Sequence, residues 1–152
     1  MSTRYAKIEE ELATRGVFYA TTVGDSMAPL FHTHEKVVRY KPVTGRLNRW
    51  DVPLVKREDG HYVLHRIVKV LPGGYITRGD NRRKCDPFVP EEQVVAVMDG
   101  YYEGQTFVSV TDPDYLAYVA KYAKPGLRRY ARLTANALKR RLRRNSPPKK
   151  SR

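Results

Sequence analysis

The stretch that decides the fold is "YVLHRIVKVLPGGYITRGD", residues 62–80. Tyr, Val, Leu and Ile dominate its two arms, 62–71 and 74–80, and Pro72-Gly73-Gly74 between them is a strong turn signal. We expect each arm to form one strand. Strands separated by so few residues pair antiparallel, because a parallel partner needs a long crossover. The stretch therefore predicts an antiparallel sheet.

Similar short runs of β-branched and aromatic residues recur along the chain. They lie at residues 17–23, 36–40, 52–57, 93–98 and 106–110. Turn signals such as Asp59-Gly60 separate them. About seven short strands with tight connections predict a mainly β fold, a coiled antiparallel sheet or partial barrel. Before the first strand, residues 4–15 have helix-forming composition and Gly16 ends them, so we expect an N-terminal helix.

From Asp112 onward the pattern becomes helical. Asp112 suits an N-cap with Pro113 at the first helical position, and Pro125-Gly126 should divide the segment into two helices. The second helix has an apolar stripe flanked by Arg and Lys. Its members are Leu127, Tyr130, Leu133, Ala137, Leu138 and Leu142. We expect a body over 1–111, a basic amphipathic helical extension over 112–145 and a disordered tail over 146–152.

The charge of the chain is divided between body and extension. The sequence holds 29 Lys and Arg against 16 Asp and Glu, a formal net charge of +13. All the acidic residues lie at or before Asp114, and the 13 basic residues after it account for the whole net charge. Because the first 114 residues are electrically balanced, body and extension need separate functional interpretations.

Composition also predicts where the protein works. No apolar run approaches the roughly 20 residues that cross a bilayer, and the N-terminus has acids where a secretory signal has an apolar core. The single cysteine, Cys85, is too few for a disulfide or a cysteine-based metal site, and the pair His32 and His34 lacks a third ligand at a diagnostic spacing. We therefore expect a cytoplasmic protein with its basic extension at the inner face of the membrane, and neither cofactor nor metal.

Three segments carry the side chains of a hydrolytic site. "GDSMAPLF" contains Ser26, "YVLHRIV" contains His65, and "YITRGDNRRKCD" contains Asp80 and Asp86. A serine hydroxyl is a poor nucleophile until a neighbouring base removes its proton. The base in turn needs a carboxylate to fix its tautomer. Together the segments offer the inventory of a Ser-His-Asp triad, with either carboxylate available for the third role.

In this order the three segments resemble the catalytic boxes of type I signal peptidases. Ser26-Met27-Ala28-Pro29 is similar to the nucleophile box of that family, His65-Arg66 to its base box, and Gly79-Asp80-Asn81 to its Gly-Asp-Asn box. The match covers about residues 17–98. It implies a signal-peptidase type of β fold and a serine endopeptidase that cleaves an extended peptide or precursor protein alongside its strands.

The residue at the base position distinguishes two subtypes of that family. Bacterial members generally carry Lys there, whereas archaeal and endoplasmic-reticulum members carry His and a second Asp six positions after the Asp of the Gly-Asp-Asn box. This chain has His65, and Asp86 stands six positions after Asp80. The resemblance implies Ser26 as the nucleophile, His65 as the base, and Asp86, or in its place Asp80, as the group that orients His65.

Two departures from that family bear on function. Many members place a hydroxyl two residues before the nucleophile as a second oxyanion donor. Here that residue is Gly24, so a backbone N–H or Thr22 would have to serve. Members are also held at the membrane by transmembrane segments, for which this sequence has no candidate. We therefore expect a soluble member that cleaves a cytosolic or membrane-surface precursor.

Other interpretations of the basic extension and of the whole protein stay open. A cationic amphipathic helix can lie on anionic lipid, bind nucleic-acid phosphates without sequence preference, or pack on the body by one face. As an alternative, the catalytic boxes are the degenerate scaffold of a non-catalytic protein that binds nucleic acid or an anionic membrane. Binding through the extension should weaken with salt and vanish on truncation near residue 112, whereas catalysis by the body should survive that truncation.

Overall fold

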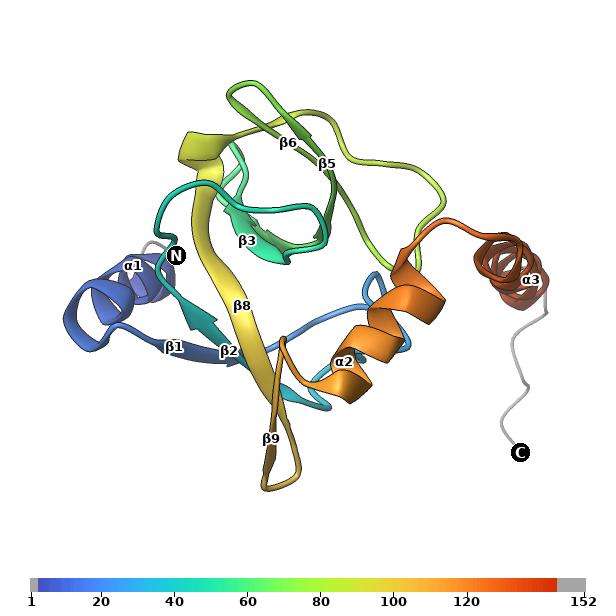
Figure 1. The fold of residues 1–152 in the computed structure, drawn as a ribbon, viewed down its shortest axis with the longest axis horizontal. Helices are drawn as coiled ribbons and strands as arrows, with labels where there is room; N and C mark the ends of the chain where they lie inside the picture. Colours follow the sequence, from blue (N-terminus) through green and yellow to red (C-terminus); the bar gives the residue numbers. More distant parts are fainter. Residues whose placement is uncertain (1–2, 145–152) are drawn as a thin grey trace, which may run out of the picture.

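The computed structural model describes residues 3–144, so the tail expected at 146–152 lies outside the described residues. The protein is mainly β, with helices at both ends of the chain (Figure 1). In chain order the elements are α1 (Thr3–Arg15), β1 (Phe18–Thr21), β2 (Val37–Lys41), β3 (Pro53–Lys56), β4 (Tyr62–Leu64), β5 (Arg66–Leu71), β6 (Gly74–Arg78), β7 (Val89–Pro90), a 3-10 turn (Glu91–Gln93), β8 (Val94–Glu103), β9 (Thr106–Ser109), α2 (Pro113–Tyr118), its π-helical continuation (Val119–Ala123) and α3 (Leu127–Arg144).

A six-stranded antiparallel sheet forms the larger part of the body, in the order β1-β2-β8-β3-β4, with β9 also paired to β8. The long strand β8 runs through its middle and pairs with β2 on one side and with β3 and then β9 on the other (Figure 1). The register shifts within both β2 and β3, and such bulges increase the twist. The sheet curls into a half-barrel that leaves β1 and β4 as its two edge strands.

A second, three-stranded antiparallel sheet contains β5, β6 and β7. The prediction of a single strand over 62–71 is therefore wrong, because the chain leaves the first sheet after Leu64 and enters the second at Arg66. Residues 62–64 pair with β3, whereas residues 66–71 pair with β6. His65 is the single residue between the two sheets. The expected turn before Gly74 is present, with Gly73 at a φ of +74°.

The main core joins the curled sheet to α2 and to the turn after β1. Its buried members include Val38, Tyr40, Leu54, Ala96 and Met98 from the sheet, Met27, Leu30 and Phe31 from the turn, and Tyr115, Val119 and Ala123 from the C-terminal part. Residues 113–123 are thus packed into the body. A truncation near residue 112 would remove three core side chains, so we no longer expect catalysis to survive it.

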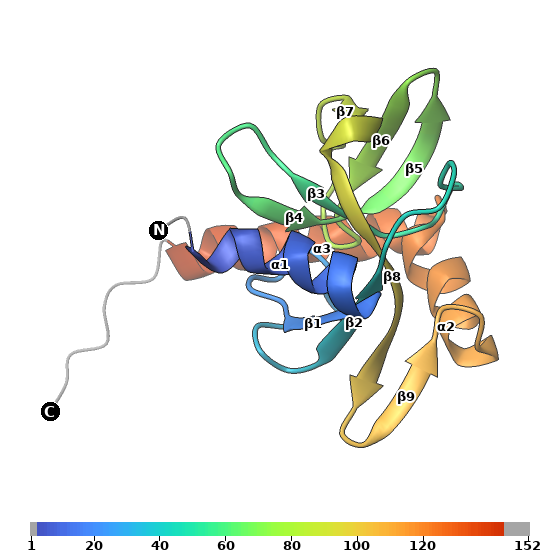
Figure 2. The same cartoon turned by 90° about the vertical axis from the view of Figure 1, so that its left-hand side faces the viewer.

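The remaining elements follow the sequence-based expectations closely. The N-terminal helix is confirmed as α1, Asp112 is the N-cap of α2 with Pro113 in its first turn, and the chain breaks before α3 at Pro125-Gly126. The two-residue strand β7 was not predicted, because so short a segment leaves no periodic signal. α1 and α3 lie on opposite sides of the molecule (Figures 1 and 2).

Candidate active site

His65 lies at the junction of the two sheets and contacts Asp86. Its Nδ1 is 2.6 Å from Asp86 Oδ2, and the two side chains are only 11% and 16% exposed. Because an ionised carboxylate can only accept a hydrogen bond, Nδ1–H donates, and in the neutral imidazole Nε2 then carries the lone pair. This is the tautomer that a general base requires.

The Asp86 carboxylate is held by two further side chains. Thr77 Oγ1 donates to the same Oδ2 at 2.7 Å, and Arg57 Nη2 donates to Oδ1 at 3.3 Å. Burial raises the pKa of Asp86, but the hydrogen bonds from His65 and Thr77 and the charge of Arg57 outweigh it and hold that pKa below its ordinary value. Asp86 therefore stays ionised at neutral pH. Neither Thr77 nor Arg57 has a sequence signal that would have identified it.

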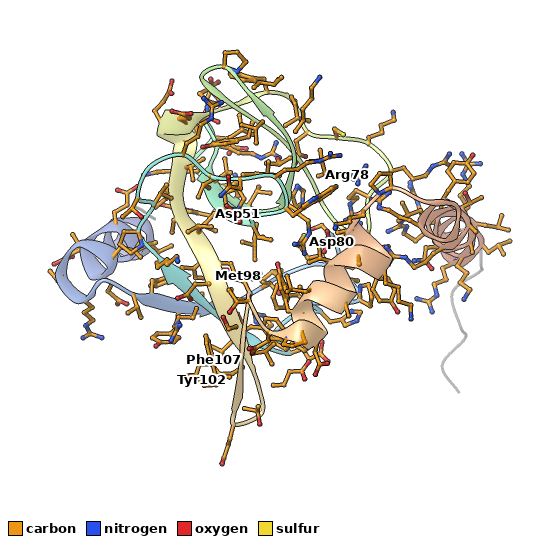
Figure 3. The ribbon with its side chains drawn as sticks, viewed as in Figure 1. Asp51, Arg78, Asp80, Met98, Tyr102 and Phe107 are labelled. Atoms are coloured by element: carbon orange, nitrogen blue, oxygen red, sulfur yellow. The ribbon has the colours of Figure 1, made fainter. Side chains whose placement is uncertain are left out.

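Asp80, the second candidate carboxylate, lies in a different environment. Arg66 Nε and Nη2 donate to its two oxygens at 2.8 and 2.7 Å, and the paired side chains are only 1% and 2% exposed. Tyr118 Oη donates to it at 3.0 Å from α2, beside which Asp80 lies in Figure 3. The structure thus brings Asp86 to His65 and Asp80 to the neighbouring Arg66.

Ser26 lies in the turn after β1 and lines the same groove as His65. Gly79 stands between the two segments. A Cβ on Gly79 would be 2.5 Å from the Ser26 carbonyl oxygen and 3.2 Å from His65 Nε2. Contacts this short exclude any side chain at that position, so Gly79 is what allows the nucleophile turn to approach the imidazole.

Asn81 forms two hydrogen bonds to the turn that contains Asp25 and Ser26. Its backbone N–H donates to the Ser26 carbonyl at 2.9 Å, and its side-chain Nδ2 donates to the Asp25 carbonyl at 3.1 Å. Met27 is buried in the core directly after the turn. The Gly-Asp-Asn segment therefore positions Ser26 through main-chain contacts.

The surroundings of Ser26 limit the candidates for an oxyanion donor. Gly24 N–H donates to Thr33 Oγ1 at 2.9 Å, and Thr22 Oγ1 donates to the His32 carbonyl at 3.4 Å. In the part of the chain that the structure describes, the Ser26 amide N–H and hydroxyl form no hydrogen bond. The Ser26 amide is thus the donor available for a developing negative charge, while Thr22 is engaged elsewhere.

A groove of about 890 Å³ opens in front of these residues. One wall is formed by residues 18–24, from β1 and the turn that follows it, and the other by residues 61–65, from β4 and its flanks. α1 contributes Ile8 and Glu11 to the lining. The groove therefore extends between the two edge strands of the curled sheet and contains both Ser26 and His65.

The inner face of α3 contacts the segment 80–82, which includes the Gly-Asp-Asn motif's Asp80 and Asn81. Arg129 Nη2 donates to the Arg82 carbonyl at 2.9 Å, and Arg132 Nη2 donates to the Asp80 carbonyl at 3.0 Å. Burial and neighbouring arginines lower the pKa of Arg129 to about 10. Asn136 Nδ2 also donates to Asn81 Oδ1 at 3.2 Å. Of the three interpretations of the extension, packing on the body by one face describes this side of the helix.

Replacing Arg132 with Met should loosen the loop that α3 holds. A hydrogen bond from a charged donor stabilises by about 1.5–3 kcal/mol, so amide hydrogen exchange at Asn81 should accelerate by roughly 10- to 100-fold. Exchange measured by mass spectrometry or NMR reports this directly. Arg144→Met, at the exposed end of α3, is the matched control and should change nothing at Asn81. Equal exchange in both variants would contradict a holding role for Arg132.

Comparisons with known proteins give no functional assignment for this chain. Neither a scan against models of known families nor a search of curated proteins finds a match to this chain. Among the helices of residues 3–144, none combines the length and apolarity needed to cross a bilayer. The same residues contain no cluster of three or more His, Cys, Asp or Glu that could hold a metal ion. His34 Nδ1 instead pairs with Thr21 Oγ1 at 2.9 Å.

Proposed function

We propose that this protein is a serine endopeptidase of the signal-peptidase type with a Ser26-His65-Asp86 triad. The observation that supports it most is the His65–Asp86 pair at 2.6 Å, with Nε2 next to Gly79 and the nucleophile turn. Two of the three motifs that resemble one family contribute Ser26 and His65 to one groove, and Gly79 of the third lies between their segments. Asp80 supports the site from behind through Arg66.

The proposed reaction is acyl transfer through a covalent intermediate. His65 Nε2 takes the proton of the Ser26 hydroxyl as its oxygen attacks the peptide carbonyl, and Asp86 stabilises the imidazolium. The Ser26 amide N–H donates to the oxyanion. His65 then returns the proton to the leaving amine, and water, activated by the same imidazole, hydrolyses the acyl-enzyme.

The proposed substrate is an extended peptide segment. β1 and β4 lie at the two ends of the strand order in the described sheet, and an extended peptide lying between them would gain main-chain hydrogen bonds as an added strand. Ser26 and His65 lie at the ends of these two walls, so a bound strand would pass the reacting side chains. Alternate side chains of the peptide would point into the groove and away from it.

A serine-reactive covalent probe tests the proposal without knowledge of the substrate. A fluorescent phosphonate should label the wild-type protein at Ser26, located by peptide mass spectrometry, and should fail to label Ser26→Ala. His65→Ala should also abolish labelling, because the hydroxyl then lacks its base. Ser109→Ala, which removes a serine on β9 away from the groove lining, is the matched control. Labelling that persists in Ser26→Ala would refute the assignment and favour a non-catalytic scaffold.

A further inference from the structure

The two faces of α3 have opposite chemistry. The side that contacts the body is largely polar, since Arg129, Arg132 and Asn136 donate to residues 80–82. Among the leucines of α3 whose side chains the structure describes, Leu133 is the buried one, at 2% exposure. The apolar stripe expected from the sequence is therefore divided between two faces. Leu138 and Leu142 point outward and are 58% and 61% exposed.

An apolar outer strip follows from this division. Ala131, Ala135, Leu138 and Leu142 are all exposed and stand at spacings of four, three and four residues, which places them along one side of a helix. α3 lies at the outside of the molecule, beyond α2 and away from both sheets (Figures 1 and 2). The outer strip is accordingly a solvent-accessible face of the helix.

Cations flank the outer strip without any compensating acid. Lys139, Arg141, Arg143 and Arg144 are exposed on α3, and the sequence has no acidic residue after Asp114. A second copy of the protein docked strip to strip would bring two such cationic sets together, which like-charge repulsion disfavours. A partner for this surface must combine negative charge with an apolar layer.

We propose that the outer strip docks this protein on the surface of an anionic lipid bilayer. Leu138 and Leu142 enter the boundary between headgroups and acyl chains, and the flanking cations lie over lipid phosphates. Nucleic acid also offers phosphates, but it gives the two leucines no apolar layer to enter. The proposal uses only the exposed face of α3 and does not depend on the proposed peptidase activity.

Docking by this face would bring the groove close to the lipid surface. The inner face of the same helix contacts the loops that carry Ser26 and Asp80, and a helix is only about 10 Å across. A membrane-bound protein would thus hold its candidate active site next to segments that leave the bilayer surface.

Vesicle co-sedimentation of the full-length protein tests the proposal. Vesicles of phosphatidylcholine with one phosphatidylglycerol in four lipids should bind it, and pure phosphatidylcholine should not. Raising the salt from about 0.1 M to about 0.5 M should weaken binding. Leu138→Ser/Leu142→Ser should reduce the affinity at least tenfold with an unchanged melting temperature. Val37→Ser, which removes an exposed apolar side chain from β2, is the control and should bind normally.

A second variant keeps the test decisive if the leucine variant is poorly folded. Lys139→Gln/Arg141→Gln/Arg143→Gln should lose about fivefold in affinity for each charge removed. Binding that survives the leucine changes and responds only to salt would overturn the outer strip as the docking surface. So would a dimer in sedimentation equilibrium that the leucine changes dissociate, or duplex DNA bound more tightly than the anionic vesicles.

Discussion

Replacing Asp86 with Asn is expected to lower the rate of Ser26 acylation by about 10⁴ while the protein stays folded. Asn can present its NH₂ to His65 Nδ1, which then becomes an acceptor, so the proton moves to Nε2 and the imidazole can no longer take the Ser26 proton. The neutral amide of the Asp86→Asn side chain also cannot stabilise the imidazolium. The rate of labelling by the serine-reactive probe measures the effect, and the melting temperature checks the fold.

Asp80→Asn is the matched comparison, because it makes the same chemical change at the other candidate carboxylate. Asp80 pairs with Arg66 and leaves His65 untouched, so its loss should lower stability and leave the pH dependence of labelling unchanged in the folded fraction. A large loss of labelling rate at constant stability in Asp80→Asn, with normal labelling in Asp86→Asn, would reverse the two roles.

Asp86→Asn should also change the dependence of stability on acid pH. The folded-state pKa of Asp86 lies below its ordinary value of 3.8, despite the opposing effect of burial, because His65, Thr77 and Arg57 favour the ionised form. The stability that this adds is present above the ordinary pKa and is lost as the pH falls through the lower, folded-state pKa. Unfolding of the wild-type protein should therefore depend more steeply on pH in that acid range than unfolding of Asp86→Asn.

The parts of the fold that depend on local sequence could be predicted. Alternating β-branched residues marked the strands, and Asp112-Pro113 and Pro125-Gly126 marked the ends of helices, because these signals act within a few residues. The division of residues 62–71 at His65 was not visible, since both halves have the same strand composition. What separates them is the choice of partner, β3 for one half and β6 for the other.

The arrangement of the site depended on long-range partners. Asp80 and Asp86 are the same type of residue, so their partners distinguish them. Asp80 pairs with the buried Arg66, whereas Asp86 pairs with His65 and Thr77. Likewise, the sequence left open whether α3 lies on lipid, binds nucleic acid or packs on the body. In the structure Arg129 and Arg132 of α3 point inward and donate to the main-chain carbonyl groups of Arg82 and Asp80, contacts between segments far apart in the sequence.

Replacing Arg66 with Met should lower the free energy of unfolding by about 3–5 kcal/mol, the largest loss of stability we expect from one substitution. Met retains most of the volume of the Arg stem, so the effect isolates the lost guanidinium. The carboxylate of Asp80, 2% exposed, would keep the hydrogen bond from Tyr118, whereas Arg132 contacts the main-chain carbonyl of Asp80 and not its carboxylate. The Trp50 carbonyl and the Tyr115 hydroxyl would each lose a donor at 3.0 and 2.8 Å. Denaturant unfolding followed by circular dichroism measures the change.

Lys56→Met supplies the matched control for the Arg66 prediction, because it also removes one cation from an ion pair. Lys56 and Glu9 are 3.0 Å apart but 40% and 49% exposed, so water screens them and the loss of stability should be much smaller than for Arg66→Met. The double variant Arg66→Met/Asp80→Leu should recover part of the stability, since no uncompensated buried charge remains. An equal loss of stability in Arg66→Met and Lys56→Met would show that the Arg66–Asp80 pair does not anchor the strand that follows His65. The assignment of a structural role to Asp80 and of the His65-orienting role to Asp86 would then lose its energetic basis.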